Sequence, residues 1–350
     1  PQLPAADRSH FVSIKLTIAK MVLGSAGMLA GLSLGREGPS VQVAAGVMHD
    51  ARRWLRPGSA MNEHALLVAG GAAGIAAAFN APLAGVVFAI EELSRKLESR
   101  NSGLIIAAIV LAGLMSVSVF GNYAYFGSMA VPHLGLAVLL PALLVVLCCG
   151  ALGGLFSRLL AASLTGSPDR FSDWRERYPV RFAAGGGLVI AIIGLVTGGA
   201  TFGAGGEEVR HMLNGEADVA NLYFLLKLVA TWVTTWCGVP GGIFAPSLSI
   251  GAGIGHDIGQ LTLGADQQLV TPALVAMGMA GFLAAVTQAP LTSFIIVMEM
   301  LDGRPMVLSL MASAMIASLI SRLISRPLYT TLSEHMISRV TGKPVEPEKR

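Results

Sequence analysis

The segment Gly35–Pro39, which reads GREGP, places a base and an acid between two glycines ahead of an apolar stretch. Proline suits the first turn of a helix because its missing N–H would be unpaired there, and glycine lets the backbone approach a ligand closely. The pattern predicts a helix start with bare backbone N–H groups, which is a site for a small anion. The Glu37 carboxylate would then compete with the anion for the same place.

A second segment, Gly241–Pro246 (GGIFAP), has the same build, with glycines followed by a proline at an expected helix start. A helix N-terminus carries a partial positive charge. Two such ends that face one point would hold an anion without a full counter-charge, and its release could stay fast.

The elements that must position these segments are expected to be membrane helices. The chain has 350 residues, of which 53% are hydrophobic and 13% charged, against about 25% charged in soluble domains. Its apolar stretches are continuous, which favours spanning helices over a barrel. Leu134–Leu160 and Val219–Trp236 are long enough to cross or nearly cross a bilayer, whereas Ser40–Val47, Ala65–Ala78 and Ala273–Val286 look short. Short, broken helices are typical of transporters and channels.

Charge and cysteine content exclude several other classes of protein. The net charge of +3 is too small to imply a polyanionic partner, and no basic-aromatic run suggests nucleic acid. The three cysteines lie in apolar segments without metal-ligand spacing. We therefore expect no metal or cofactor. The polar tail after Arg339 has slightly more bases than acids, which favours the cytoplasmic side.

The chain contains an internal repeat. Residues 39–50 (PSVQVAAGVMHD) and 246–257 (PSLSIGAGIGHD) agree at six of twelve positions, and residues 76–91 align with 284–299. Repeats of short helices are a mark of transporters with a site between the halves. We predict one membrane domain over 1–340, with halves at 1–125 and 134–340, the second inverted relative to the first, and a polar tail at 341–350. The alignment also predicts that a front part of the first half precedes Pro1.

Polar residues shared by both copies are predicted to be structural. They are Glu91 with Glu299, Asn80 with Gln288, and His49-Asp50 with His256-Asp257. We expect the His-Asp pairs to close helix ends and the two amide side chains to lie near helix caps.

Residues present in one copy only are better functional candidates. Arg36-Glu37 aligns with Ile243-Phe244, and Glu92 aligns with Met300. An ionisable group within a membrane protein is costly and is therefore a functional hypothesis. The alternative for Glu37 is an interfacial residue, and for Glu92 an ordinary solvated helix end.

Two motifs that suggest enzymes fail on context. Gly31–Gly35 matches the G-x-S-x-G pattern of hydrolases, which needs a strand-to-helix turn. Here Gly27, Gly31 and Gly35 are spaced by four residues and are expected to form a small-residue stripe on one apolar helix. Gly251–Gly255 lacks the preceding strand of a dinucleotide loop. A membrane-embedded enzyme is disfavoured.

The two loops resemble signature sequences of the CLC family of chloride channels and chloride/proton antiporters. The resemblance extends through residues 80–93 (NAPLAGVVFAIEEL) and 327–332 (PLYTTL) and covers most of the chain in the right order. It implies an all-α, inverted-repeat bundle of broken and tilted helices in a prokaryotic cell membrane. It further implies a homodimer with a separate pathway in each subunit.

The resemblance also implies roles for individual residues. Glu37 would be the gating glutamate, and Glu92 the internal glutamate that relays protons and distinguishes antiporters from channels. Tyr329 would touch the central anion through its hydroxyl, with an interfacial aromatic as the alternative. The remaining anion-binding residues would act through their backbones: Ile243 and Phe244 at the central anion, and Arg36, Gly38 and Ala245 along the outer path.

Chloride/proton exchange is the function that the resemblance implies, and a passive voltage- or pH-gated chloride channel of the same fold is the alternative. Fluoride export is disfavoured by Pro39. The family's serine-bearing GSGIP loop does not occur in the sequence, so the choice between chloride and nitrate stays open.

Overall fold

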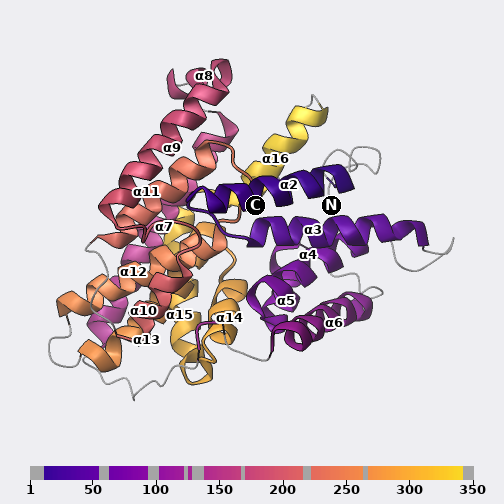
Figure 1. The fold of residues 1–350 in the computed structure, drawn as a ribbon. Helices are drawn as coiled ribbons and strands as arrows, with labels where there is room; N and C mark the ends of the chain where they lie inside the picture. The colour runs from indigo at the N-terminus through magenta and orange to yellow at the C-terminus, as the bar shows by residue number, and fades with distance from the viewer. Residues whose placement is uncertain are drawn as a thin grey trace.

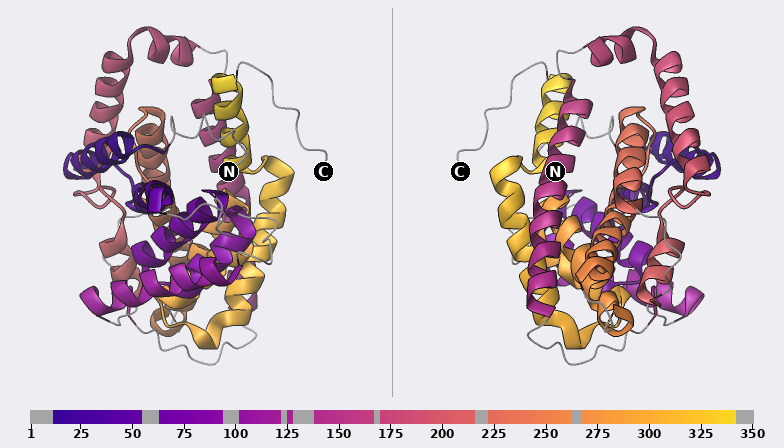
Figure 2. Two further views of the ribbon diagram at one scale, coloured as in Figure 1. Left: turned by 90° about the vertical axis from the view of Figure 1, so that its right-hand side faces the viewer. Right: turned by 90° about the vertical axis from the view of Figure 1, so that its left-hand side faces the viewer.

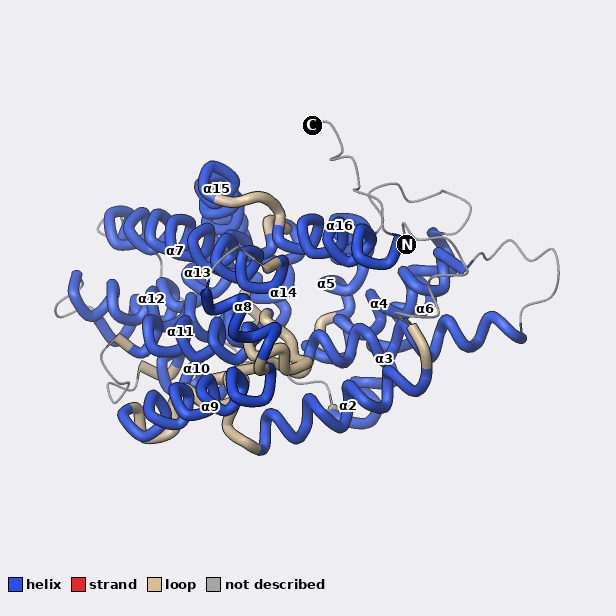
Figure 3. The backbone as a smooth tube through the Cα atoms, turned by 90° about the horizontal axis from the view of Figure 1, so that it is seen from above, coloured by secondary structure: helices blue, strands red, loops and turns tan. Residues whose placement is uncertain are grey.

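The computed structural model describes residues 12–54, 63–93, 102–121, 125–127, 138–166, 170–215, 222–262 and 267–341. Over these ranges all regular elements are helices (Figure 3), apart from one isolated β-bridge. The first copy holds α2 (Ile14–Leu29), α3 (Glu37–Asp50), η1 (Ala51–Trp54), α4 (Glu63–Phe79), α5 (Pro82–Phe88), η2 (Ala89–Leu93) and α6 (Ser102–Phe120). The predicted second half, 134–340, opens with α7 (Leu139–Thr165), α8 (Arg170–Arg177), α9 (Pro179–Val196) and α10 (Gly206–Leu213), ahead of the second copy of the repeat.

The second copy repeats the order of the first. It holds α11 (Tyr223–Trp236), α12 (Phe244–Thr262), α13 (Gln267–Thr287), α14 (Pro290–Met300), η5 (Arg304–Met306), α15 (Val307–Ile324) and a final α16 (Leu328–Thr341). Figure 1 shows α2 to α6 gathered on one side and α7, α9 and α11 to α13 on the other. The helices α5 and α14 meet between the two groups. The expected tail, 341–350, lies almost wholly outside the described residues.

The helices have the composition of a multi-pass membrane protein. Four of the described helices are long and apolar enough to span a bilayer, namely α7, α9, α13 and α15. In Figure 2 the helices α7, α9 and α15 run roughly along one direction, while α2 lies across them. The expectation of a short helix at Ala273–Val286 is wrong, because this stretch lies within α13, which is 21 residues long. Conversely, α11 is only 14 residues long, shorter than the stretch Val219–Trp236 suggests.

Helix α13 forms the centre of the bundle rather than a lipid-facing span. In its apolar window 94% of the residues are buried inside the protein, against 22% in α9. Its Gly278 lies against the backbone of Gly251 in α12, where no Cβ would fit. Close approach of helix backbones through glycine gives tight packing in membrane proteins. The second half is therefore built around the α12–α13 pair.

Each copy of the repeat places one carboxylate at the start of a helix in the other copy, and we call these two contacts the exchanged caps. Glu91 on η2 accepts hydrogen bonds from the backbone N–H groups of Leu291 (3.1 Å) and Thr292 (2.7 Å) at the start of α14. Glu299 at the end of α14 accepts bonds from the N–H groups of Leu83 (3.1 Å) and Ala84 (2.8 Å) at the start of α5. Each carboxylate satisfies orphan donors and the positive end of the other copy's helix. The prediction of a structural role agrees with this arrangement.

Asn80 and Gln288 were expected beside helix starts, and each directly precedes an N-cap residue, Ala81 of α5 or Ala289 of α14. No side-chain hydrogen bond closes either cap from the N-cap residue itself. Asn80 and Gln288 adopt left-handed backbone angles, with φ of 52° and 58°. Their side chains bond elsewhere: Ser116 donates to Asn80 Oδ1, and Gln288 Nε2 donates to the carbonyl of Ser325. The exchanged carboxylates occupy the positions at the caps instead.

Two further expectations need correction. Asp50 does end α3, but His256-Asp257 lies inside α12, which continues to Thr262. The predicted glycine stripe does not lie on one helix, because α2 ends at Leu29 and Gly31 turns the chain with a φ of +81°. The turn is required to bring Gly35 to the second copy.

A candidate anion site at two helix starts

The segments GREGP and GGIFAP meet through their backbones. Gly35 and Gly242 form the β-bridge, in which the Gly35 N–H donates to the Gly242 carbonyl at 2.8 Å and the Gly242 N–H donates to the Gly35 carbonyl at 2.7 Å. After the bridge, each segment makes a one-residue bend, and the helix α3 or α12 begins at the next residue. The structure thus brings the two expected helix starts to one place.

The repeat alignment holds residue by residue at this point. Arg36 and Ile243 are the two bend residues, and Glu37 and Phe244 are the first residues of α3 and α12. A Cβ on Gly38 would meet the Gly241 carbonyl oxygen at 3.0 Å and the Gly242 Cα at 3.2 Å. Glycine is needed at position 38 because the loops pack this closely.

The Glu37 side chain fills the space between the two helix starts. The residue is 3% exposed, and its carboxylate folds back against the backbone of Gly35 and Gly242. Backbone N–H groups of Glu37 itself and of Ala245 interact with the carboxylate. One oxygen, Oε2, is buried without a hydrogen-bond partner among the described residues. A buried carboxylate aimed at two helix starts occupies the place where an anion would bind.

Phe244 anchors this site in the core. Its ring stacks on Phe79 with centroids 6.3 Å apart and meets the edge of Phe88 at 6.2 Å. The ring of Tyr329, on the first turn of α16, lies 6.2 Å away on a tilted plane. Sequence reasoning missed Phe79 and Phe88, although both flank the NAP segment. Their packing fixes the start of α12 and with it the N–H groups that face Glu37.

Tyr329 lies within reach of the charges of both glutamates, because the Glu37 and Glu92 carboxylates each influence its phenol. Glu92 lies on η2, a π-helical turn that continues α5, and it is partly exposed. The π-helical turn is held by Glu91 through the start of α14. Helical widening of this kind is frequent at functional sites.

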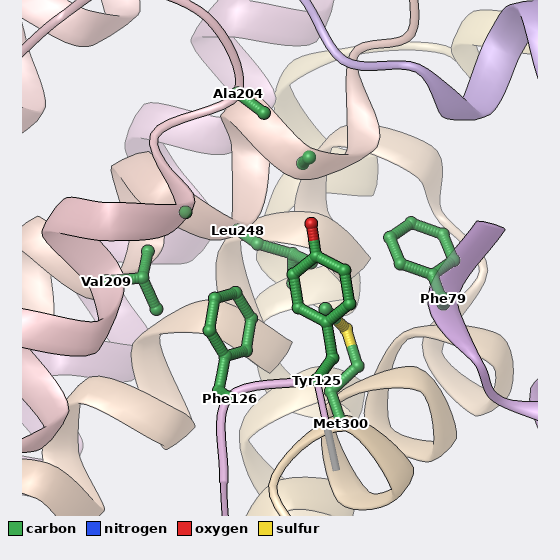
Figure 4. Close-up of a pocket in the computed structure, with 9 residues that line it drawn as sticks. Phe79, Tyr125, Phe126, Ala204, Val209, Leu248 and Met300 are labelled. Atoms are coloured by element: carbon green, nitrogen blue, oxygen red, sulfur yellow. The ribbon is translucent and has the colours of Figure 1, made fainter. Parts of the chain in front are cut away.

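The ring of Tyr125 packs against Arg36, and the sequence did not predict this contact. The Arg36 guanidinium stands 5.5 Å from the centre of the Tyr125 ring, and that of Arg210 stands 6.0 Å from the same ring. Arg210 also donates to the Tyr125 carbonyl at 2.9 Å. Figure 4 shows Tyr125 between Phe126 and Phe79.

Sequence comparison decides the family. The pattern described as voltage gated chloride channel matches residues 4–322. The chain belongs to this family. Within it, the chain is 31% identical over 332 residues to the H⁺/Cl⁻ exchange transporter ClcA of Klebsiella pneumoniae, covering 91% of this chain and 69% of the relative.

Solved structures of this family agree with the fold. A slow cyanobacterial Cl⁻/H⁺ antiporter superposes with a TM-score of 0.77 at 26% identity, over 93% of this chain and 77% of the other. A CLC-type fluoride/proton antiporter superposes with a TM-score of 0.68 at 25% identity, over 86% and 73%. The all-helical membrane fold and the membership in the CLC family are thereby confirmed. The functional roles of the individual residues remain predictions.

Proposed function

We propose that the protein exchanges chloride for protons across the membrane, with the anion held by backbone N–H groups at the starts of α3 and α12. The observation that carries this proposal is the buried Glu37 carboxylate between two bridged helix starts. The relatives named as proton-coupled exchangers support it. A passive voltage- or pH-gated channel of the same fold is the alternative.

Glu37 acts as the switch in this mechanism. Ionised, its carboxylate occupies the place between the helix starts and blocks the anion. Protonated, it loses its attraction to the N–H groups and to the positive helix ends, and the anion takes its place. Anion movement and proton movement are coupled because one site cannot hold both negative charges at close range. Ile243, Phe244 and Ala245 supply the backbone of the α12 start.

Protons reach Glu37 from the side of Tyr329 and Glu92. The charges of both carboxylates influence the Tyr329 phenol, and Glu92 is partly exposed. In this proposal Glu92 exchanges protons between water and the buried Glu37. In this proposal the Tyr329 hydroxyl donates a hydrogen bond to the bound anion, which is supported by the packing of its ring against Phe244 at the start of α12. No resident metal or cofactor is required, since the anion and the proton are the transported species.

The test is a flux measurement on the full chain in proteoliposomes, with chloride and pH electrodes. Glu37→Gln keeps the size of the side chain but cannot ionise, so we expect chloride movement that is independent of pH and carries no protons. Glu176→Gln, an exposed carboxylate on α8, is the matched control and should exchange like the wild type. Proton movement that is still driven by chloride in the Glu37→Gln protein would refute the proposal. Nitrate and fluoride gradients in the same vesicles measure the selectivity.

The assembly proposed from the family resemblance is a homodimer in the lipid bilayer, with one pathway in each subunit. Exposed leucines on α9 and α15, such as Leu188 and Leu319, provide apolar surface for lipid and for a second copy. Cross-linking in membranes followed by mass determination distinguishes a dimer from a monomer.

A further inference from the structure

Helix α8 lies at the level of one membrane surface, because it connects two helices that can span a bilayer. The candidate span α7 ends at Thr165, and the candidate span α9 begins at Pro179. The eight residues of α8 rise about 12 Å, far less than the roughly 30 Å of a hydrocarbon core. In Figure 1 α8 lies at one end of the bundle, beyond the start of α9. The helix is therefore an interfacial element.

Helix α8 is held against three of the neighbouring helices. The Arg175 guanidinium donates to the Ser163 carbonyl in the last turn of α7 at 2.7 Å. The Phe171 ring lies 6.0 Å from the ring of Trp236 in α11. The Trp174 ring meets, edge-on at 5.3 Å, the ring of a phenylalanine in the first turn of α9. These contacts fix which side of α8 faces the protein and which side faces outward.

The aromatic side chains of this region are only partly covered by these contacts. Phe171 remains 59% exposed, Trp174 39%, and Tyr178, the residue before α9, 49%. Tryptophan and tyrosine are enriched at the level of the lipid headgroups, because each ring has an apolar body and a polar edge. The three rings therefore place α8 at the boundary between acyl chains and headgroups, where amphipathic helices lie in the plane of the membrane.

Exposed arginines surround these rings. Arg170 and Arg177 are the two end residues of α8, and Arg181 lies in the first turn of α9 with its guanidinium 5.1 Å from the Tyr178 ring. Among the residues that the structure describes, no carboxylate forms an ion pair with any of these three arginines. Their guanidinium groups are thus open to an anion from outside the protein.

The charge balance of this region is positive. Residues 170–181 contain four arginines and two acids, Asp173 and Glu176. Glu176 lies 4.0 Å from Arg339 at the end of α16, so a further base lies beside one of the two acids. An excess of arginine and lysine next to spanning helices indicates the cytoplasmic side, and the cytoplasmic leaflet is the one with a negative surface potential.

We propose that α8 and the start of α9 bind anionic phospholipids of the cytoplasmic leaflet. Arg170, Arg177 and Arg181 contact the phosphate groups, and Phe171 and Trp174 lie among the upper parts of the acyl chains. A guanidinium donates two parallel hydrogen bonds to a phosphate. The neighbouring exposed rings require an apolar partner, which a phospholipid provides and a dissolved anion does not. The inference is independent of the exchange function.

The test uses the tryptophan fluorescence of the full chain in proteoliposomes. Of the four tryptophans, Trp174, Trp232 and Trp236 belong to this region, and Trp54→Phe removes the fourth. Phosphatidylglycerol with brominated acyl chains, diluted into phosphatidylcholine, quenches the tryptophans that it contacts. We expect quenching at a lower mole fraction than with brominated phosphatidylcholine. Added salt should weaken this preference, because exposed charges are screened.

Substitutions of opposite sign sharpen the test. Arg177→Gln and Arg181→Gln should each raise the mole fraction of brominated phosphatidylglycerol at half-maximal quenching about fivefold. Asp173→Asn should lower it by a similar factor. Arg53→Gln is the matched control, because this exposed arginine on η1, paired with Asp50, removes the same charge at another place. Retained chloride flux shows that each variant is folded.

Each outcome decides for or against the lipid site. A preference for phosphatidylglycerol that weakens in the Arg177 and Arg181 variants, but not in the Arg53 control, supports it. Equal quenching by the two brominated lipids overturns it. An equal loss in the Arg53 control also overturns it, because net charge alone would then attract the lipid. Relief of the quenching by inorganic phosphate at constant ionic strength would assign the arginines to a dissolved anion and overturn it as well.

Discussion

Glu37 and Phe244 occupy equivalent positions in two loops that pair through Gly35 and Gly242. One copy places a carboxylate at its helix start, and the other places a ring that packs into the core. The backbone provides the same N–H groups on both sides. The chemical difference between the two helix starts therefore lies in the side chains at this position and at the bend residues Arg36 and Ile243.

A prediction at this scale concerns Glu92, which has no acidic mate in the second copy. Glu92→Gln removes the ionisable carboxylate at this position of η2, keeps its size and leaves Glu91 in place. In proteoliposomes we expect chloride flux to persist while chloride-driven proton flux falls to background, because Glu37 loses its proton supply. Glu176→Gln serves again as the control. Full proton coupling in the Glu92 variant would remove the reason to prefer exchange over a passive channel.

The two loops were predictable from the sequence, whereas the outer aromatic contact was not. GREGP and GGIFAP carry their signal locally, because glycine and proline at a helix start constrain the backbone whatever surrounds them. Tyr125 lies outside the aligned segments of the repeat, and its two arginine partners come from distant parts of the chain. Such a contact is created by tertiary packing and leaves no periodic pattern.

At the scale of elements, the sequence predicted the two helix starts beside Asn80 and Gln288, and α5 and α14 begin there. Asn often caps a helix with its own side chain, but these two amides do not bond to the N–H groups of the helix starts. The left-handed angles of Asn80 and Gln288 turn these side chains away, and a carboxylate from the other copy binds the free N–H groups. The repeat alignment identified Glu91 with Glu299 and Asn80 with Gln288 as equivalent positions. It could not tell which of these side chains binds the N–H groups of which helix start.

The exchanged caps lead to a stability prediction. Glu299→Ala leaves the N–H groups of Leu83 and Ala84 without their acceptor, and we expect a loss of about 1–2 kcal/mol. Glu91→Ala should cost a similar amount at α14. Glu176→Ala is the control, since its pairing with Arg339 at 4.0 Å is exposed on both sides and such pairs contribute little. Thermal unfolding in detergent measures all three, and equal melting temperatures would contradict the capping role.

For the whole molecule, apolar sequence alone could not separate lipid-facing helices from the central one. Both α9 and α13 pass the same hydropathy test, yet one is mostly exposed and the other mostly buried. Bilayer and protein interior are equally apolar, so composition does not distinguish them. The small-residue content of α13, including Gly278, is the sequence signal that corresponds to its central place.

A pair of glycine substitutions tests this central packing. A Cβ on Gly278 would overlap the Gly251 carbonyl, so Gly278→Ala must push α12 from α13 and is expected to cost about 1–3 kcal/mol. Gly187→Ala in α9 meets nothing within 4 Å and should stabilise the helix by about 0.5–1 kcal/mol. Melting curves in detergent check the opposite signs. A stabilised Gly278 variant would show that the α12–α13 contact is loose.

The reciprocal contact of Glu91 with α14 and of Glu299 with α5 has a consequence for the origin of the chain. The repeat alignment converts one of these contacts into the other. Such a reciprocal pair of contacts is what a twofold interface between identical subunits contains. In an ancestor of half the length, a single glutamate would have made both contacts, once in each direction, as two copies paired with one another. Gene fusion would then have freed the two copies to diverge. The helix starts next to Gly35 and Gly242, where one copy carries Glu37 and the other Phe244, record that divergence.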